Sequence, residues 1–139
     1  MNHIETISHG DEVFALIVYS YQATKPIDFF TQDSASLQVG KHARKAGEVI
    51  KGHKHLPVKV ERFETLQEVL YLENGKMKVN FYTDEGRWFK SKVFKKGDLI
   101  LIIKGGHDFE FLEETQMIEV KQGPYNPASK VILDIKEDE

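Results

Sequence analysis

The residues of this chain best suited to chemistry are two histidines separated by a single residue, together with a glutamate and a third histidine that follow them. Residues 52–55 read Gly-His-Lys-His, so His53 and His55 flank a single lysine. Alternate side chains of a β-strand point to one face, so both imidazoles can reach one point in space. Imidazole is the commonest metal ligand in proteins. Glu68 and His107 follow on separate predicted strands, and together the four side chains predict a metal site that needs no cysteine.

The elements that must position these residues are predicted to be strands. Turn signals such as Asn74-Gly75 separate runs that are rich in β-branched and aromatic residues. No segment shows sustained helical periodicity, although one short turn of helix is expected at 27–30 or 35–37. Many short strands at even spacing predict an all-β sandwich or barrel. The predicted strands are residues 13–19, 37–39, 47–55, 58–63, 67–72, 77–82, 88–94, 99–103, 107–112 and 117–121, with 131–135 as an edge strand.

Composition argues against several classes of protein. The 139 residues suit one compact domain, and the absence of cysteine excludes disulfides and thiolate metal sites. A net charge of -3 supplies no basic excess for nucleic-acid binding. The apolar runs are much shorter than the roughly 20 residues that a membrane helix needs, and no secretory signal is recognisable. We therefore expect a cytoplasmic protein without nucleic-acid or membrane partners.

The spacing of the histidines, the glutamate and two glycines resembles the first motif of the cupin superfamily. That motif consists of a glycine, a His-x-His pair, a glutamate and a second glycine. Here it is met by Gly47, His53, His55, Glu68 and Gly75, with five residues between the first glycine and the pair and six between the glutamate and the last glycine. The closest likeness is to small single-domain bacterial cupins of uncharacterised function.

The second cupin motif, and two departures from the family pattern, affect which residues are expected to bind the metal. Gly97 opens that motif and His107 closes it, one residue earlier than is usual, and an isoleucine stands in place of the usual proline. The family has three or four residues between the second histidine and the glutamate, but this chain has twelve. Glu61 and Glu64 are therefore alternatives to Glu68, although only Glu68 has the family spacing to the following glycine.

The resemblance implies an all-β fold, a single-domain cupin with a jelly-roll β-barrel over residues 1–139. Its motifs lie within 47–112, its N-terminal strands within 1–46 and a C-terminal extension within 122–139. It implies that His53, His55, Glu68 and His107 bind a divalent transition metal. Such a donor set suits Fe, Mn, Ni, Co or Zn without selecting among them and leaves about two positions open. It also implies a homodimer, which the apolar run at 13–19 would suit; an ordinary buried strand of one barrel explains that run equally well.

Four further residues are candidates for lining a pocket beside the metal. Phe109 and Phe111 share one strand face with His107, so their rings should line that pocket. Arg44 is a cationic candidate for an anionic substrate, unless it lies in a solvated basic loop. Lys121 shares a strand face with a neighbouring glutamate, with which it either forms a pair or lies at the mouth of the pocket.

Three functions agree with these residues. The first is a metal-dependent enzyme that acts on a small molecule, with oxygenase or isomerase chemistry. The second is a metal-free sugar or sugar-nucleotide epimerase or isomerase that uses His53 or His107 as its base. The third is a non-catalytic module that binds a small ligand.

Overall fold

A computed structural model describes residues 3–57 and 65–137. The chain divides into two compact units. The first unit comprises Met1–Ser20 and Thr65–Glu139, and the second comprises Tyr21–Glu64. The prediction of a single domain over residues 1–139 stays a prediction.

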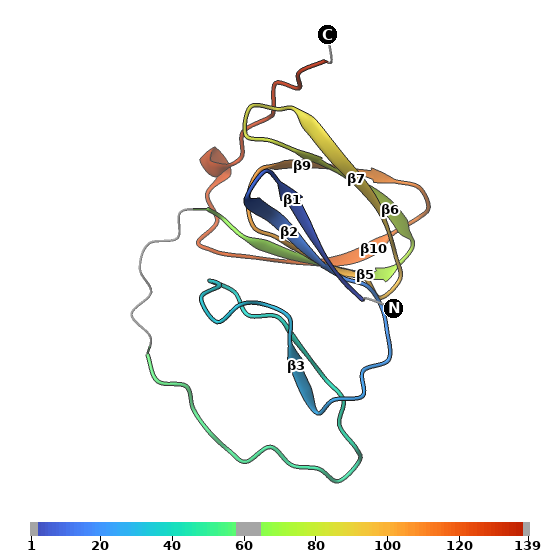
Figure 1. The fold of residues 1–139 in the computed structure, drawn as a ribbon, viewed down its shortest axis with the longest axis vertical. Coiled ribbons are helices and arrows are strands. Elements are labelled where there is room, and N and C mark those ends of the chain that lie inside the picture. The colour runs from blue at the N-terminus through green and yellow to red at the C-terminus, as the bar shows by residue number, and fades with distance from the viewer. Residues whose placement is uncertain (1–2, 58–64, 138–139) are drawn as a thin grey trace. The chain divides into compact units, whose positions relative to one another are not determined.

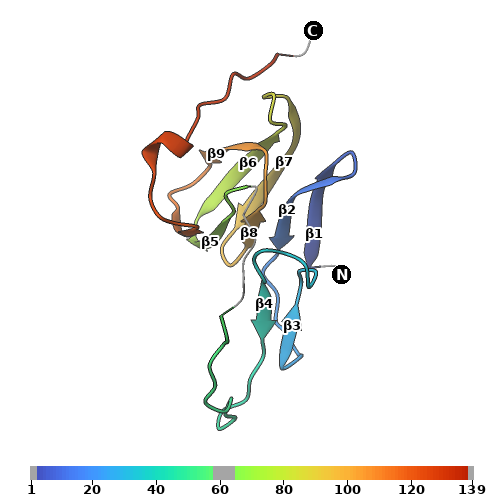
Figure 2. The same ribbon diagram turned by 90° about the vertical axis from the view of Figure 1, so that its left-hand side faces the viewer.

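The first unit consists of two antiparallel sheets (Figures 1 and 2). The larger sheet has five strands and the smaller has three. Within the larger sheet β5 lies between β8 and β10, and within the smaller β6 lies between β7 and β9. In spatial order, the larger sheet comprises β1 (Ile4–His9), β2 (Glu12–Val18), β8 (Leu99–Ile102), β5 (Glu68–Asn74) and β10 (Gln116–Lys121), and the smaller comprises β7 (Trp88–Lys95), β6 (Lys76–Tyr82) and β9 (Gly106–Phe111).

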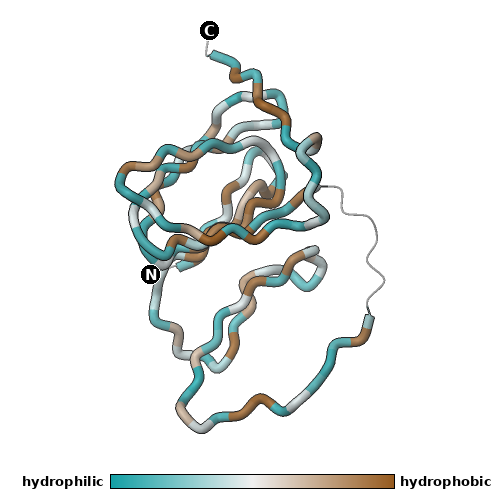
Figure 3. Tube along the Cα trace, turned by 180° about the vertical axis from the view of Figure 1, so that it is seen from behind, coloured by the Kyte–Doolittle hydropathy of each residue, from teal (hydrophilic) through white to brown (hydrophobic). Residues whose placement is uncertain are grey.

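The two sheets bury a shared apolar core. Alternation along β5 and β6 turns every second side chain inward, which is why Leu70 and Val79 are fully buried. Burying an aliphatic or phenyl side chain contributes about 1.5–3 kcal/mol to folding. Figure 3 shows these apolar stretches along the strands. The core cluster consists of Ile7, Ala15, Ile17, Leu70, Leu72, Met77, Val79, Phe81, Phe94, Ile100 and Ile102.

Tight turns set the register of the strands. The Asn74-Gly75 hairpin joins β5 to β6 as predicted, and Gly75 has a φ of 97°. A Cβ atom there would lie 2.5 Å from the carbonyl oxygen of Glu114, so both the backbone angle and the space favour glycine. After β7, the buried Asp98 carboxylate accepts hydrogen bonds from the backbone N–H groups of Ser20 and Lys95, each at 2.8 Å.

The second unit contains one short antiparallel pair, β3 (Ile27–Phe29) with β4 (Gly40–His42). Its remaining described residues form turns and extended backbone and are largely exposed. Phe29 is 59% exposed even within its strand. Among its described residues, 21–57, this unit therefore has no counterpart of the core that holds the first unit together.

The all-β prediction is confirmed, but several predicted elements are wrong. Most strands of the first unit lie within a residue or two of their predicted bounds. Residues 47–55 and 131–135 form no strand, the strand expected at 37–39 begins at Gly40, and 27–29 is a strand rather than a turn of helix. β1 is an additional strand that the residue patterns did not mark individually. The predicted strand at 58–63 lies outside the described residues.

Helical structure is slight. The described residues contain one 3-10 turn, η1 (Pro127–Ser129), which begins after Asn126. Asn126 caps the turn because its side-chain oxygen accepts a hydrogen bond from the backbone N–H of Ala128 at 3.0 Å. In the part of the chain that the structure describes, no helix has the length and apolar character needed to cross a membrane.

Candidate functional site

A glutamate from one sheet meets a histidine from the other at the end of the sandwich. Glu68 is the first residue of β5, and His107 is the second residue of β9. Their side chains lie 2.8 Å apart, from His107 Nε2 to Glu68 Oε1. Glu68 is only 8% exposed, so its carboxylate depends on protein partners rather than on water.

A second carboxyl group and a lysine complete this polar cluster. Lys121 lies directly opposite Glu68 in the pairing of β10 with β5, and Glu119 lies two residues earlier on the same face. The hydrogen bond from His107 lowers the pKa of Glu68, burial opposes that shift, and the charge of Lys121 adds to it. The hydrogen bond between the two carboxyl groups raises the pKa of Glu119, as do burial and the charge of Glu68. The pair therefore favours one ionised carboxylate beside one carboxyl that keeps its proton more readily.

Of the two ring nitrogens of His107, Nε2 is paired with Glu68. Its Nδ1 atom is buried and has no hydrogen-bond partner among the described residues. The ring stacks on Phe109, with 5.2 Å between the ring centroids and 27° between the planes. An unpaired buried polar atom costs about 1–3 kcal/mol.

A cavity of about 710 Å³ opens beside this cluster, entirely within the first unit. That volume lies inside the range of about 300–1,000 Å³ that is usual for small-molecule sites. Its walls include Glu68, His107, Phe109, Glu119 and Lys121. An apolar enclosure with a few convergent polar groups is the usual form of a small-molecule site.

The predicted ligand set is divided between the two units. Glu68 and His107 belong to the first unit and are in contact. His53 and His55 belong to the second, where both are exposed and their ring centroids lie 5.1 Å apart. They lie on extended backbone outside any strand, so the strand alternation on which their pairing was predicted does not apply. His53 Nδ1 lies 2.8 Å from the carbonyl oxygen of Lys51.

The other predicted site residues have different surroundings. Phe109 and Lys121 line the cavity, whereas Phe111 is 54% exposed and is not part of the described cavity wall. Arg44 belongs to the second unit, where it forms an ion pair with Glu48 at 3.8 Å. The alternative carboxylates Glu61 and Glu64 lie outside the described residues.

Two features of the site were not predicted from the sequence. One is the contact between the carboxyl groups of Glu68 and Glu119, which depends on the register of β5 against β10. The other is a cavity wall formed by the C-terminal segment, residues 129–135. The only sequence signal for that wall is the apolar composition of 131–135, which was instead interpreted as an edge strand.

No family model, curated protein or solved structure matches this chain at a significant level. Within the described part of either unit, no three histidine or acidic side chains are arranged as a complete metal site. The cupin resemblance therefore depends on the motif residues, with an antiparallel all-β fold that is compatible with it.

Proposed function

We propose that this chain is a cupin-like protein that binds a small molecule in the cavity of the first unit, beside a divalent metal ion. The proposed metal ligands at this cavity are Glu68 and His107, and the motif resemblance predicts His53 and His55 as further ligands. The observation that carries the proposal is the contact between Glu68 and His107 at the cavity wall. It joins two of the four motif residues although 38 positions separate them in the sequence.

The geometry of this contact suits two ligands of one ion. Metal–nitrogen and metal–oxygen bonds of about 2.0–2.2 Å at a right angle place the two donor atoms about 3 Å apart. The observed separation of 2.8 Å between His107 Nε2 and Glu68 Oε1 is close to that value.

The two remaining donors are compatible with the proposal. The rings of His53 and His55 are near neighbours, with 5.1 Å between their centroids, which keeps two imidazoles within reach of one ion. Three imidazoles and one carboxylate suit Fe, Mn, Ni, Co or Zn. When bound, such an ion would act as a Lewis acid toward a ligand in the cavity. Glu68 and His107 would hold it, and the second carboxyl, Glu119, would orient Glu68 through their hydrogen bond.

Metal binding can be tested directly on the purified chain. Metal analysis should find a transition metal, and adding Mn, Ni, Co or Zn to the chelator-treated protein should raise its melting temperature. Glu68→Gln and His107→Ala should abolish that rise, and His53→Ala and His55→Ala should weaken it. His42→Ala, an exposed histidine of the second unit, is the matched control and should leave it intact. A chain that carries no metal and shows no stabilisation by any of these ions would overturn the metal proposal.

A metal-free sugar or sugar-nucleotide epimerase or isomerase is the second candidate. It is favoured by the contact between His107 Nε2 and Glu68, because a carboxylate hydrogen-bonded to an imidazole orients it as a general base. Activity on such a substrate that survives exhaustive chelation, and is lost in His107→Ala, would favour this candidate over the metal-dependent one.

The homodimer that the resemblance implies stays a proposal. The apolar run that suggested it is β2, which lies between β1 and β8 and places Ala15 and Ile17 in the core of the first unit. Its hydrophobicity therefore needs no partner chain as an explanation. Sedimentation equilibrium on the full chain would decide the oligomeric state.

A further inference from the structure

The outer strand β10 carries exposed apolar side chains beside unpaired backbone. β10 ends the five-stranded sheet, where one of its edges pairs with β5. Within residues 3–57 and 65–137 its other edge has no strand partner. On the face away from the core, Ile118 is 48% exposed and Val120 is 60% exposed, and the neighbouring Tyr71 of β5 is exposed as well. An exposed, apolar strand edge of this kind favours pairing with another strand.

Two of the other outer strands of the first unit are protected against such pairing. β7 contains three lysines among its eight residues, and charged side chains on an edge discourage association. β1 has an irregular register between Ile7 and Ser8, which interrupts its edge. Its Glu5 also forms an ion pair with Lys92 of β7 at 2.7 Å.

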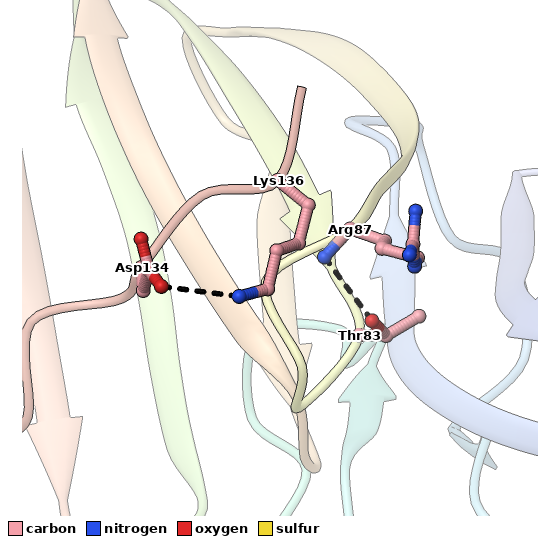
Figure 4. Close-up of polar contacts among 4 residues, drawn as sticks. All are labelled: Thr83, Arg87, Asp134 and Lys136. Atoms are coloured by element: carbon pink, nitrogen blue, oxygen red, sulfur yellow. Dashed lines mark hydrogen bonds and ion pairs between the residues drawn. The ribbon is translucent and has the colours of Figure 1, made fainter. Parts of the chain in front are cut away.

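The C-terminal segment lies against the remaining outer strand, β9. At Gly106, the first residue of β9, the Leu133 side chain occupies the space that a Cβ atom would need. The backbone N–H of Lys136 donates a hydrogen bond of 3.0 Å to the carbonyl oxygen of Gly86 in the β6–β7 turn. Figure 4 shows the segment at this turn, where Lys136 Nζ lies 3.0 Å from Asp134 Oδ2. Of the four outer strands, β10 therefore has the least protected edge.

The backbone of β10 determines which residues can bond to a further strand. Gln122, which follows β10, donates its backbone N–H to the carbonyl oxygen of Gln67 at 3.5 Å. Backbone groups alternate in direction along an antiparallel strand, so Val120 directs its groups to β5, and Glu119 and Lys121 direct theirs to the open edge. A strand that pairs with this edge therefore bonds to the backbone of these last two residues.

The same edge of a second copy is complementary to this one. When two identical antiparallel strands are related by a two-fold axis normal to the sheet, side chains of like faces lie opposite one another. Centred on Val120, this pairing places Glu119 opposite Lys121 of the second copy, and the symmetry repeats the pair. Each such pair of opposite charges contributes about 0.2–1 kcal/mol, whereas a pairing centred on Glu119 would place two glutamates opposite one another.

From this arrangement we infer that the chain forms a homodimer in which two β10 strands pair antiparallel about Val120. The two five-stranded sheets then continue as one. Because Glu119 lines the cavity, each copy also brings its Lys121 beside the cavity wall of the other. β10 has only six residues, so we expect weak association with a Kd of about 10–500 µM. The dimer requires neither a metal ion nor a ligand in the cavity.

Single-cysteine variants report on the pairing directly, because the chain has no cysteine of its own. Val120→Cys places two sulfur atoms at a non-hydrogen-bonded pair, where the Cα atoms lie about 4.5 Å apart and within disulfide range. Ile118→Cys places its two sulfur atoms about 13 Å apart along the strands. Under mild oxidation Val120→Cys should cross-link about tenfold faster than Ile118→Cys or Val93→Cys, an exposed position of β7, because only its sulfur atoms start within bonding range.

Sedimentation equilibrium at up to about 1 mM protein measures the same dimer without cross-linking. Val120→Lys should abolish association, because it sets two ammonium groups against each other at the two-fold axis, and Val93→Lys is the matched control. Glu119→Lys should weaken the dimer about tenfold, and adding Lys121→Glu should restore it, because the opposite charges are then exchanged. Amide NMR dispersion shows which variants fold, and the cysteine variants decide the register if the charge-exchanged chain does not.

Three outcomes would overturn the inference. A chain that stays monomeric at about 1 mM would overturn the dimer. A dimer that persists in Val120→Lys would overturn the β10 surface as its interface. Faster cross-linking of Ile118→Cys than of Val120→Cys would overturn the register. Metal titration of the monomeric Val120→Lys chain then tests the metal proposal separately, because that side chain lies on the face away from the cavity.

Discussion

The two pairs of predicted ligands lie in contrasting surroundings. Glu68 and His107 extend from paired strands that share a buried core, and the contact between them crosses from one sheet to the other. His53 and His55 lie on exposed backbone without ladder hydrogen bonds. Side chains on rigid elements are held in position before a ligand arrives, whereas exposed ones must be ordered at a cost in entropy. The first pair is therefore preorganised, and the second pair would have to be ordered by whatever it binds.

The largest expected difference between the two units is in core stability. Phe81 is 2% exposed between the sheets of the first unit, and Phe29 is 59% exposed in the second. Phe81→Ala should lower the free energy of unfolding by about 3–5 kcal/mol because it leaves a cavity. Phe29→Ala should change it by less than about 0.5 kcal/mol. Urea unfolding measures both, and similar costs would contradict the contrast.

Removing a predicted ligand side chain should also destabilise the first unit more than the second, even without any metal. His107→Ala should destabilise the chelator-treated protein by about 1–3 kcal/mol, because it leaves the buried carboxylate of Glu68 without its partner. His53→Ala should cost less than about 0.5 kcal/mol, because that side chain is exposed. Thermal and urea unfolding of both variants would check this, and a larger cost for His53→Ala would reverse our description of the two pairs.

Replacing a glycine in each unit compares how tightly the backbone of the two units is constrained. Gly75→Ala should cost about 1–3 kcal/mol, because φ is 97° and the new methyl group would meet the carbonyl oxygen of Glu114. Gly52→Ala in the second unit should be nearly neutral, since no atom of the described residues, apart from the two chain neighbours, lies within 4 Å of the position that its Cβ would take. If Gly75→Ala unfolds at the same urea concentration as the unsubstituted chain, the β5–β6 turn is less constrained than described.

The smallest expected effect appears only in alkaline solution. Burial, together with the hydrogen bond to Asp108, raises the pKa of Tyr82 to about 12 from its ordinary value of 10.0. A raised pKa favours the neutral phenol in the folded state. Its contribution is therefore complete below pH 10 and is lost as pH rises from about 10 through 12.

Unfolding measured between pH 9 and pH 12 would detect this loss. Tyr82→Phe should be less stable than the unsubstituted chain near pH 9, because Asp108 loses a hydrogen bond. The difference should shrink as pH approaches 12. A constant difference over that interval would show that Tyr82 does not titrate as described.

Local patterns were sufficient for most strands of the first unit. Alternation of apolar side chains marks a strand because inward and outward positions alternate with a period of two, and Asn74-Gly75 marks a hairpin because glycine accepts a positive φ. These signals depend on neighbouring residues alone. They failed at 47–55 and 131–135, where apolar and β-branched residues are present but the chain finds no strand partner among the described residues.

The candidate site was predicted only in part, for a related reason. Residue type and motif spacing were sufficient to select Glu68, His107 and Lys121. The contact with Glu119 and the wall formed by Leu133 depend on strand register and on where the C-terminal segment lies, and neither leaves a local pattern.

Local residue patterns alone therefore predicted that this chain forms β-sheets, and motif spacing selected Glu68 and His107 as candidate ligands. Only the tertiary structure decided which of those residues meet. It placed a glutamate and a histidine from opposite sheets 2.8 Å apart and left two lysines of the cavity wall without an ion pair among the described residues. The physical reason is that such contacts join positions far apart in the chain, so their geometry is set by how the sheets pack rather than by the residues beside them.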